Sequence, residues 1–152
     1  MTTPTAPREP LPAAAFVRTD AHRFRATALT RGPWHPDHQH AGPPIALVCG
    51  EIERVAAQHG LNHLARLTAN LLRPVPIAEL TVEVATDYAG RNAGHFSARL
   101  QAGDKEIARF TALAQRESDA PVPDPRPAGL LAPAAPRAPA DCPGAQFPFA
   151  GR

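Results

Sequence analysis

Apolar residues recur at helical spacing between residues 45 and 56. At about 100° per residue they fall within one arc of about 120°, the width of a stripe that faces a protein core. The residues on this stripe are Ile45, Val48, Cys49, Ile52, Val55 and Ala56. Glu51, Arg54 and Gln58 fall on the opposite side. The pattern therefore predicts a helix with one buried and one solvated face, and it places Glu51 on the solvated face.

The boundaries of this helix also follow from the sequence. Pro43 and Pro44 suit a first turn, where a missing N–H removes no intrahelical bond, and Gly60 suits a helix end. A helix start presents unpaired N–H groups and the positive end of the helix dipole, so it can receive an oxyanion or a carbonyl oxygen. The backbone donors that remain there belong to Ala41, Gly42 and Ile45. We expect any chemistry of the chain to gather at this end of the helix.

Alternating apolar and polar positions predict about five strands around the helix. The predicted strands lie in residues 16–29, 65–76, 80–88, 95–100 and 106–114. Pro74 and Pro76 end the second of these or place it at a sheet edge. The segment 106–114 is apolar on both faces, as expected of a central strand that a helix covers. One helix against an antiparallel sheet of about five strands is an α+β fold.

Proline separates the ends of the chain from its middle. Nine of the 19 prolines lie in residues 121–148, and four more precede residue 13. We therefore predict a disordered segment over residues 1–15, one folded domain over 16–117 and a flexible Pro-rich tail over 118–152. A folded unit of about 100 residues buries only a limited fraction of its surface when it folds alone. A homodimer, which buries more, is therefore expected.

Charge and composition narrow the classes of function. The net charge of +2 is nearly balanced, and no run of Lys and Arg interleaves with aromatic residues, so we expect no nucleic-acid partner. The apolar run 13–17 is too short for a signal or a membrane span, which predicts a cytoplasmic protein without a membrane partner. Cys49 and Cys142 form no CxxC pair and are interpreted as free thiols.

Several kinds of catalytic site have no sequence signature in this chain. Ser97 and Ser118 lie outside any G-x-S-x-G motif, which argues against a serine hydrolase. No P-loop or dinucleotide-binding motif is present, and no cofactor is expected. The spacing of His35, Asp37 and His38 matches no common metal motif, so a solvated His-rich loop is the alternative there and no metal site is predicted.

Four segments together carry a resemblance to a known family. They read LTRGPW (29–34), HPDHQHAGPPIALVCGEIE (35–53), ARLTANLLRPVPIAELTVEV (65–84) and ARLQAGDKEIAR (98–109). Over roughly residues 16–116 the chain resembles the N-terminal HotDog domain of the acyl-CoA thioesterase-like family. The resemblance implies a long central helix wrapped by an antiparallel sheet, with acyl-CoA thioesters as substrate or ligand. The closing FPFAG also resembles the linker that precedes a second HotDog domain in longer relatives.

The family resemblance also bears on the catalytic residues. In double-HotDog relatives, the second domain supplies most of the hydrolytic residues, and this sequence has no match to it. In single-domain relatives, an Asp or Glu follows the His of an HGG motif by nine residues, whereas here His40-Ala41-Gly42 is followed at that spacing by Cys49. Glu51 comes two residues later, about 200° around the helix. We take His40 and Glu51 as candidate catalytic residues. Candidate substrate-binding residues are Gly42, Pro43, Pro44, Ile45, Thr68 and Asn70.

Alternatives to these site assignments remain open. Cys49 suits a buried, inert thiol, and Glu51 suits a solvated face unless a subunit interface desolvates it. Thr68 and Asn70 also suit the polar side of a strand. At the level of function, one hypothesis is an acyl-CoA thioesterase in which a water is activated near His40 or Glu51. The other is a non-catalytic module for acyl-thioester binding or partner assembly, paired as a homodimer or with a second HotDog domain on another chain.

Overall fold

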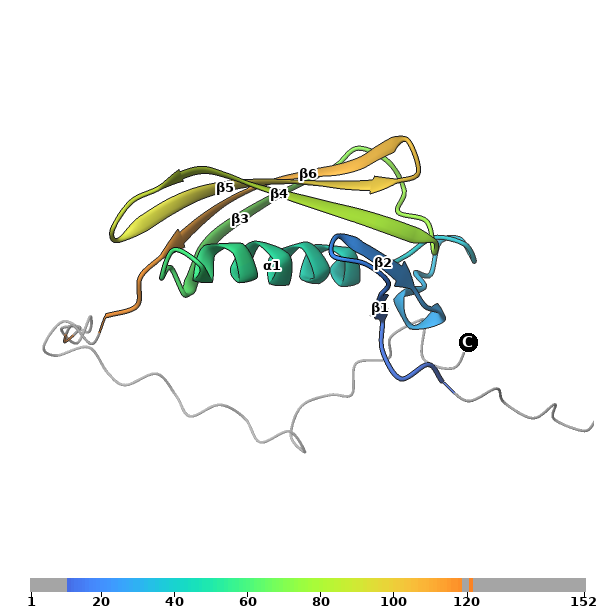
Figure 1. Cartoon of the computed structure of the whole chain (residues 1–152). Coiled ribbons are helices and arrows are strands. Elements are labelled where there is room, and N and C mark those ends of the chain that lie inside the picture. Colours follow the sequence, from blue (N-terminus) through green and yellow to red (C-terminus); the bar gives the residue numbers. More distant parts are fainter. Residues whose placement is uncertain (1–10, 119–120, 122–152) are drawn as a thin grey trace, which may run out of the picture. The chain divides into compact units, whose positions relative to one another are not determined.

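The computed structural model describes residues 11–118 and 121, which form one α-helix, one short 3₁₀ helix and six strands. In chain order these are β1 (Phe16–Arg18), β2 (Arg23–Ala26), η1 (Ala28–Thr30), α1 (Gly42–Ala57), β3 (His63–Leu71), β4 (Glu79–Ala89), β5 (Ala93–Ala102) and β6 (Lys105–Gln115). The strands form one antiparallel sheet in the order β1-β2-β4-β5-β6-β3, and α1 lies across one face of it (Figure 1). The predicted α+β architecture is confirmed, with six strands where about five were expected.

The additional strand arises within residues 16–29, which the alternating pattern predicted as a single strand. A turn folds this segment into the β1–β2 hairpin, in which the Thr19 N–H donates to the Arg23 carbonyl at 2.9 Å. Asp20 supports the turn because its Oδ1 accepts from the Ala21 N–H at 2.7 Å. Neither Gly nor Pro marks this turn in the sequence. Apolar and polar residues alternate only from Arg23 to Ala28, and the residues before the turn were joined to that run, so one strand was predicted instead of two.

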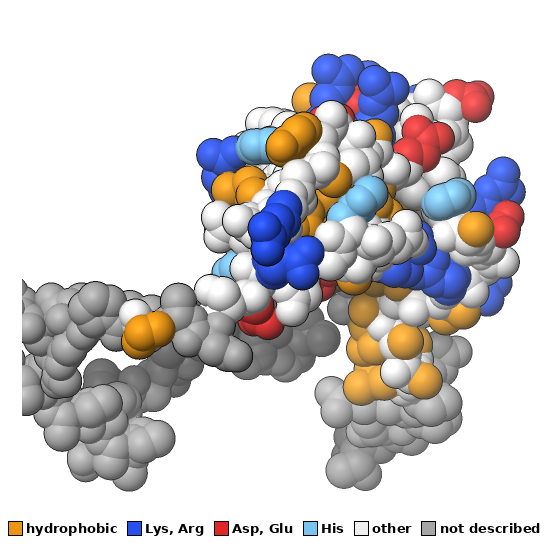
Figure 2. Space-filling model, turned by 60° about the vertical axis from the view of Figure 1, so that its left-hand side comes forward, with side chains coloured by type: hydrophobic (Ala, Val, Ile, Leu, Met, Phe, Trp, Pro, Cys, Tyr) orange, Lys and Arg blue, Asp and Glu red, His pale blue; other side chains and the backbone are white. Residues whose placement is uncertain are grey.

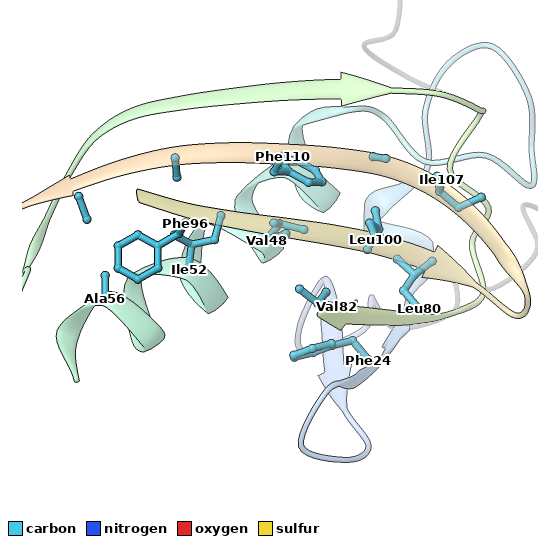
Figure 3. Close-up of a cluster of buried hydrophobic side chains, with 14 of the residues drawn as sticks. Phe24, Val48, Ile52, Ala56, Leu80, Val82, Phe96, Leu100, Ile107 and Phe110 are labelled. Atoms are coloured by element: carbon cyan, nitrogen blue, oxygen red, sulfur yellow. The ribbon is translucent and has the colours of Figure 1, made fainter. Parts of the chain in front are cut away.

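The hydrophobic core lies between α1 and the sheet. Figure 3 shows Val48, Ile52 and Ala56 of α1 in the same cluster as Phe96 of β5 and Phe110 of β6. All five side chains are at most 1% exposed. The predicted apolar stripe of the helix therefore does face the core.

The positions of β3 and β6 in the sheet agree with the sequence predictions. β3 lies at an edge of the sheet, in agreement with the proline pair that follows it, and β6 lies between β5 and β3.

After α1, Gly60 adopts a φ of 69°, in the left-handed region that favours glycine, and the Leu61 N–H donates to the Ala56 carbonyl at 3.1 Å. Gly60 thus closes the turn that ends the helix, three residues beyond Ala57.

Some sequence predictions concern residues other than 11–118 and 121. The segments predicted as disordered (1–15) and as a flexible tail (118–152) lie mostly beyond the described residues, together with Cys142. Those assignments stay predictions. In the part of the chain that is described, no helix has the length and hydrophobicity to cross a bilayer.

Candidate functional site

A hairpin-like loop leads into the N-terminus of α1. Its two arms are joined by backbone hydrogen bonds: the Gly32 N–H donates to the His38 carbonyl and the His40 N–H donates to the Thr30 carbonyl, each at 2.8 Å. Arg31 and Gln39 form an antiparallel bridge between these bonds. The loop therefore presents the His-rich sequence in a defined conformation at the start of the helix.

Gln39 ties this loop to the connection between β3 and β4. Its backbone N–H donates to the Val75 carbonyl at 2.8 Å, and its Nε2 donates to the Pro76 carbonyl at 2.6 Å. The side chain is only 5% exposed, and its Oε1 has no hydrogen-bond partner among the described residues. Sequence reasoning did not single out Gln39. Its position between His38 and His40 could have indicated its role. In an extended segment, successive side chains point to opposite sides, so Gln39 points away from these two histidines.

His40 is held at the entrance to α1 by two contacts. Its Nδ1 accepts from the Gly42 N–H at 3.2 Å, and its ring stacks on Trp34 with centroids 5.7 Å apart and planes 20° from parallel. Because Nδ1 is an acceptor here, the neutral imidazole carries its proton on Nε2. The exposed His40 ring thus lies beside the start of the helix, with Nδ1 turned toward Gly42 and the Nε2–H on the other edge of the ring.

The backbone at the helix start adds one further donor. Ala41 precedes the first helical residue without a side-chain cap, and its N–H makes no hydrogen bond within the described part of the chain. Pro43 and Pro44 have no N–H to contribute. The positive end of the helix dipole acts at the same place. His40 Nε2–H and the Ala41 N–H are therefore two donors, each available to a ligand oxygen that carries or develops negative charge.

The other residues of the loop make different contacts. His35 and His38 stack with ring centroids 4.4 Å apart, and the Asp37 N–H donates to His35 Nδ1 at 3.2 Å. In residues 11–118, no group of three His, Cys, Asp or Glu side chains is arranged to hold a metal ion.

Glu51 does not lie on a solvated face, and that prediction is wrong. The residue is 5% exposed and accepts hydrogen bonds from Arg18 of β1 and Arg54 of α1. Arg54 Nη2 lies 3.1 Å from Glu51 Oε2, and the Arg18 guanidinium also lies 4.4 Å above the centre of the Phe24 ring. The β1–β2 hairpin brings Arg18 to this side of α1, and the periodicity of the helix alone does not reveal that contact.

The environment of Glu51 is unfavourable for a general base. Burial raises the pKa of its carboxyl, but the hydrogen bonds and charges of Arg18 and Arg54 outweigh burial and leave that pKa below its ordinary value. Gly42 and Glu51 are nine residues apart, which corresponds to roughly 13 Å along a helix. Within one chain, Glu51 and His40 are therefore too far apart to act on one bond. The catalytic role of Glu51 stays a prediction, and its contacts here are those of a structural ion pair.

The candidate substrate residues divide between the two faces of the sheet. Gly42 is exposed, Pro43 and Ile45 are half-buried and Pro44 is buried, all at the start of α1. Thr68 and Asn70 pair with Thr111 and Arg109 of β6, which lie on the exposed face of the sheet, whereas the intervening residues of β6 face the core. Within one chain, Thr68 and Asn70 are thus on the far side of the sheet from α1 and do not meet His40.

The match to a protein family begins at this loop. The family model for the acyl-CoA thioesterase N-terminal domain matches residues 30–115, which is more than half of the chain. The chain belongs to this family. No curated protein sequence matches it significantly.

Solved structures show the same fold as this acyl-CoA thioesterase-family domain. The E. coli PaaI protein from the phenylacetic acid degradation operon is 19% identical, with a TM-score of 0.58 over 63% of this chain and 70% of its own. The tesB protein of Mycobacterium avium subs paratuberculosis is 18% identical, with a TM-score of 0.56 over 74% of this chain but only 43% of its own. A Bacillus halodurans protein solved with CoA is 12% identical, with a TM-score of 0.55 over 61% and 64%. These similarities confirm the predicted HotDog fold.

In this thioesterase-family domain, Cys49 is half-buried and makes no disulfide within the described residues. Burial raises the pKa of its thiol, and the nearby negative charge of Glu53 raises it further. Both effects disfavour the thiolate, which is the nucleophilic form. The interpretation of Cys49 as an unreactive thiol is consistent with this environment, although the residue is less buried than expected.

Proposed function

We propose that this domain binds acyl-CoA thioesters with the thioester carbonyl at the N-terminal end of α1, and that it hydrolyses them there with water. The observation that carries the proposal is the placement of His40, whose ring is held beside the helix start by the contact of Nδ1 with the Gly42 N–H and by stacking on Trp34. Membership in the acyl-CoA thioesterase family supports the choice of ligand. The B. halodurans neighbour that was solved with CoA supports it as well.

The proposed chemistry depends on stabilising charge at the carbonyl oxygen. Addition of water to a thioester places negative charge on that oxygen, and fixed donors near it lower the barrier. His40 Nε2–H and the Ala41 N–H would supply these donors. A proton must also leave the attacking water, and neither Glu51 in its ion pair nor the Cys49 thiol is suited to accept it. We therefore expect slow turnover unless a paired domain contributes a base.

Replacing His40 with alanine should lower thiol release from acyl-CoA by about 100-fold, the usual effect of removing one donor to a developing oxyanion. Free thiol would be followed with acetyl-, hexanoyl- and benzoyl-CoA. His35→Ala is the matched control, since His35 stacks on His38 and does not contact Gly42, and it should behave as wild type. Equal loss in both variants would contradict the assigned role of His40.

Binding can be measured separately from hydrolysis in this chain. Trp34 is its single tryptophan and stacks on His40, so its fluorescence should change when a thioester occupies the site. The absence of both a fluorescence change and thiol release across the panel would overturn the proposed function.

The second candidate function is acyl-thioester binding without catalysis. It is favoured by the ion pair of Glu51 and the raised pKa of the Cys49 thiol, which leave no nucleophile or base beside His40 among these residues. A fluorescence change with every ligand but no thiol release would support this function over hydrolysis.

We further propose a two-fold homodimer in which sheets join edge to edge through β3. β3 is the last strand in the sheet order and forms one of its two edges. Leu71 and Leu72, at its C-terminal end, are 44% and 50% exposed. A stable pair would be expected to bury about 1,600 Å² in total. Light scattering at micromolar concentration should give twice the mass of the chain. A monomeric mass for the folded protein would contradict the dimer.

A further inference from the structure

A hollow of about 590 Å³ lies next to the loop that carries His40. It forms where this loop, the connection between β3 and β4 and the turn between β5 and β6 meet, at the end of the sheet where α1 begins (Figure 1). Its lining includes His38, Arg73, Pro74, Pro76, Asp104 and Lys105. The contacts described for His40 and Ala41 involve no residue of this lining.

The walls of the hollow are fixed by backbone contacts. The N–H groups of Leu72 and Arg73 both donate to the Ile107 carbonyl, at 2.9 and 3.2 Å. His38 bridges to Pro76, which joins the loop to the opposite wall. Gly103 adopts a φ of 56° in the turn that presents Lys105. The hollow is thus bounded by three segments that are hydrogen-bonded or tightly turned.

The charges around the hollow favour an anion. Arg73 and Lys105 supply two cations, and neither forms an ion pair with a carboxylate among the described residues. Asp104 is the carboxylate in the lining, and nearby Glu106 is held by Arg109 at 2.5 and 3.0 Å. Two unpaired cations on the walls of one cavity suit a phosphate group better than an uncharged ligand. Figure 2 shows one face of the molecule, on which Lys and Arg side chains lie in several separate groups between hydrophobic and other side chains.

The hollow is also close to the proposed thioester site along the chain. His38 lines it, and His40 is two residues further along the same arm of the loop. In an extended segment, residues two apart project to the same side and lie about 7 Å apart. In CoA, the pantetheine arm joins the thioester sulfur to the phosphates of the nucleotide. A thioester at His40 would therefore direct the arm past His38 toward Arg73 and Lys105.

We propose that this hollow binds the phosphates of the CoA nucleotide while the thioester lies at the start of α1. The inference rests on the proposed function, because it assigns the other end of the same ligand. It predicts that the protein distinguishes acyl-CoA from an acyl-pantetheine thioester, which carries the same acyl group and arm but no phosphate. It also predicts that salt weakens binding of acyl-CoA and not of acyl-pantetheine.

The test compares butyryl-CoA with S-butyryl-pantetheine by isothermal titration calorimetry. The double variant Arg73→Gln/Lys105→Gln should bind butyryl-CoA about 10- to 100-fold more weakly, because it loses two charge-assisted contacts, and should bind S-butyryl-pantetheine as wild type does. Arg91→Gln/Arg99→Gln is the control, since both residues are exposed, lie outside the hollow and give the same change in net charge. It should leave both affinities near those of wild type. Thermal melts would establish that each variant is folded.

The possible outcomes separate this site from the function on which it rests. Equal affinity of wild type for the two ligands, or equal weakening of both by the double variant, would overturn the phosphate site while the thioester site stands. Weakening by the control variant to the same degree would overturn it too, because the effect would then be one of net charge. If wild type binds neither ligand, both the proposed function and this site are wrong.

Discussion

Replacing Glu51 with alanine should lower the free energy of unfolding by about 2–3 kcal/mol, which corresponds to a fall of roughly 10 °C or more in Tm for a domain of this size. The loss arises because Arg18 and Arg54 both donate to this buried carboxylate. Breaking a fully buried pair costs about 3–5 kcal/mol. The two arginine side chains are 45% and 47% exposed, so water can solvate them after the change and the cost should fall below that range. Urea and thermal denaturation would measure it.

The control for this prediction is Glu53→Ala. Glu53 is exposed on the same helix and forms none of the ion pairs found among the described residues, so its removal should change stability by at most about 0.5 kcal/mol. Similar losses in the two variants would point to a general effect of helix charge instead of the ion pair.

The contribution of Glu51 should also depend on pH in a defined direction. Its pKa is lower in the folded protein than its ordinary value, so its stabilising effect is present above the pKa of the unfolded chain, about 4.3 for Glu. The effect is lost as pH falls through the folded-state pKa. The difference in stability between wild type and Glu51→Gln should therefore be largest near neutral pH and shrink below about pH 4. A difference that stays constant on acidification would contradict the ionic contribution.

An alanine at Gly94 should cost about 1–3 kcal/mol, the usual effect of overpacking a core. Gly94 is buried on β5, and a Cβ there would lie 2.7 Å from Leu61 Cδ1 and 2.9 Å from the Tyr88 carbonyl oxygen. The leucine side chain can rotate, but the carbonyl belongs to the paired strand β4 and cannot move without shifting the sheet. The expected loss is therefore larger than for a contact with side chains alone.

The matched control is Gly50→Ala, which should have the opposite sign. Gly50 is exposed in the middle of α1, and a Cβ there would meet no atom within 4 Å. Alanine favours the helix and restricts the unfolded chain, so this change should stabilise the protein by up to about 1 kcal/mol. Chemical denaturation of both variants would test the pair. A neutral Gly94→Ala would mean that β4 and β5 can separate locally at no cost.

Local sequence patterns predicted those parts of the fold that depend on neighbours in the chain. Helical spacing correctly identified Val48, Ile52 and Ala56 as core residues, since periodicity alone decides which side of a helix is apolar. It failed for Glu51 because the partner that buries this residue, Arg18, lies 33 positions earlier in the chain. A carboxylate that a distant hairpin covers has the same local pattern as one in water.

The candidate site was predictable to a similar extent. Proline and glycine signals placed His40 correctly at the helix start, but the hydrogen bond that fixes its proton on Nε2 depends on side-chain geometry that no pattern encodes. The alternation of β3 correctly assigned Thr68 and Asn70 to the polar side of the strand. It did not reveal that α1 begins against the other face of the sheet. That information resides in the pairing of β3 with β6, which joins distant segments.

The strand order has a consequence for the kinetics of folding. β4, β5 and β6 are joined by short turns, whereas β2 pairs with β4 between Arg23 and Thr81, 58 positions apart. Closing such a long loop costs chain entropy, so we expect the meander to form before the β1–β2 hairpin docks. Contacts made after the rate-limiting barrier slow unfolding without accelerating folding. The ion pair between Arg18 and Glu51 should thus determine how long the folded domain persists more than how quickly it forms, and Glu51→Ala should act mainly on the unfolding rate.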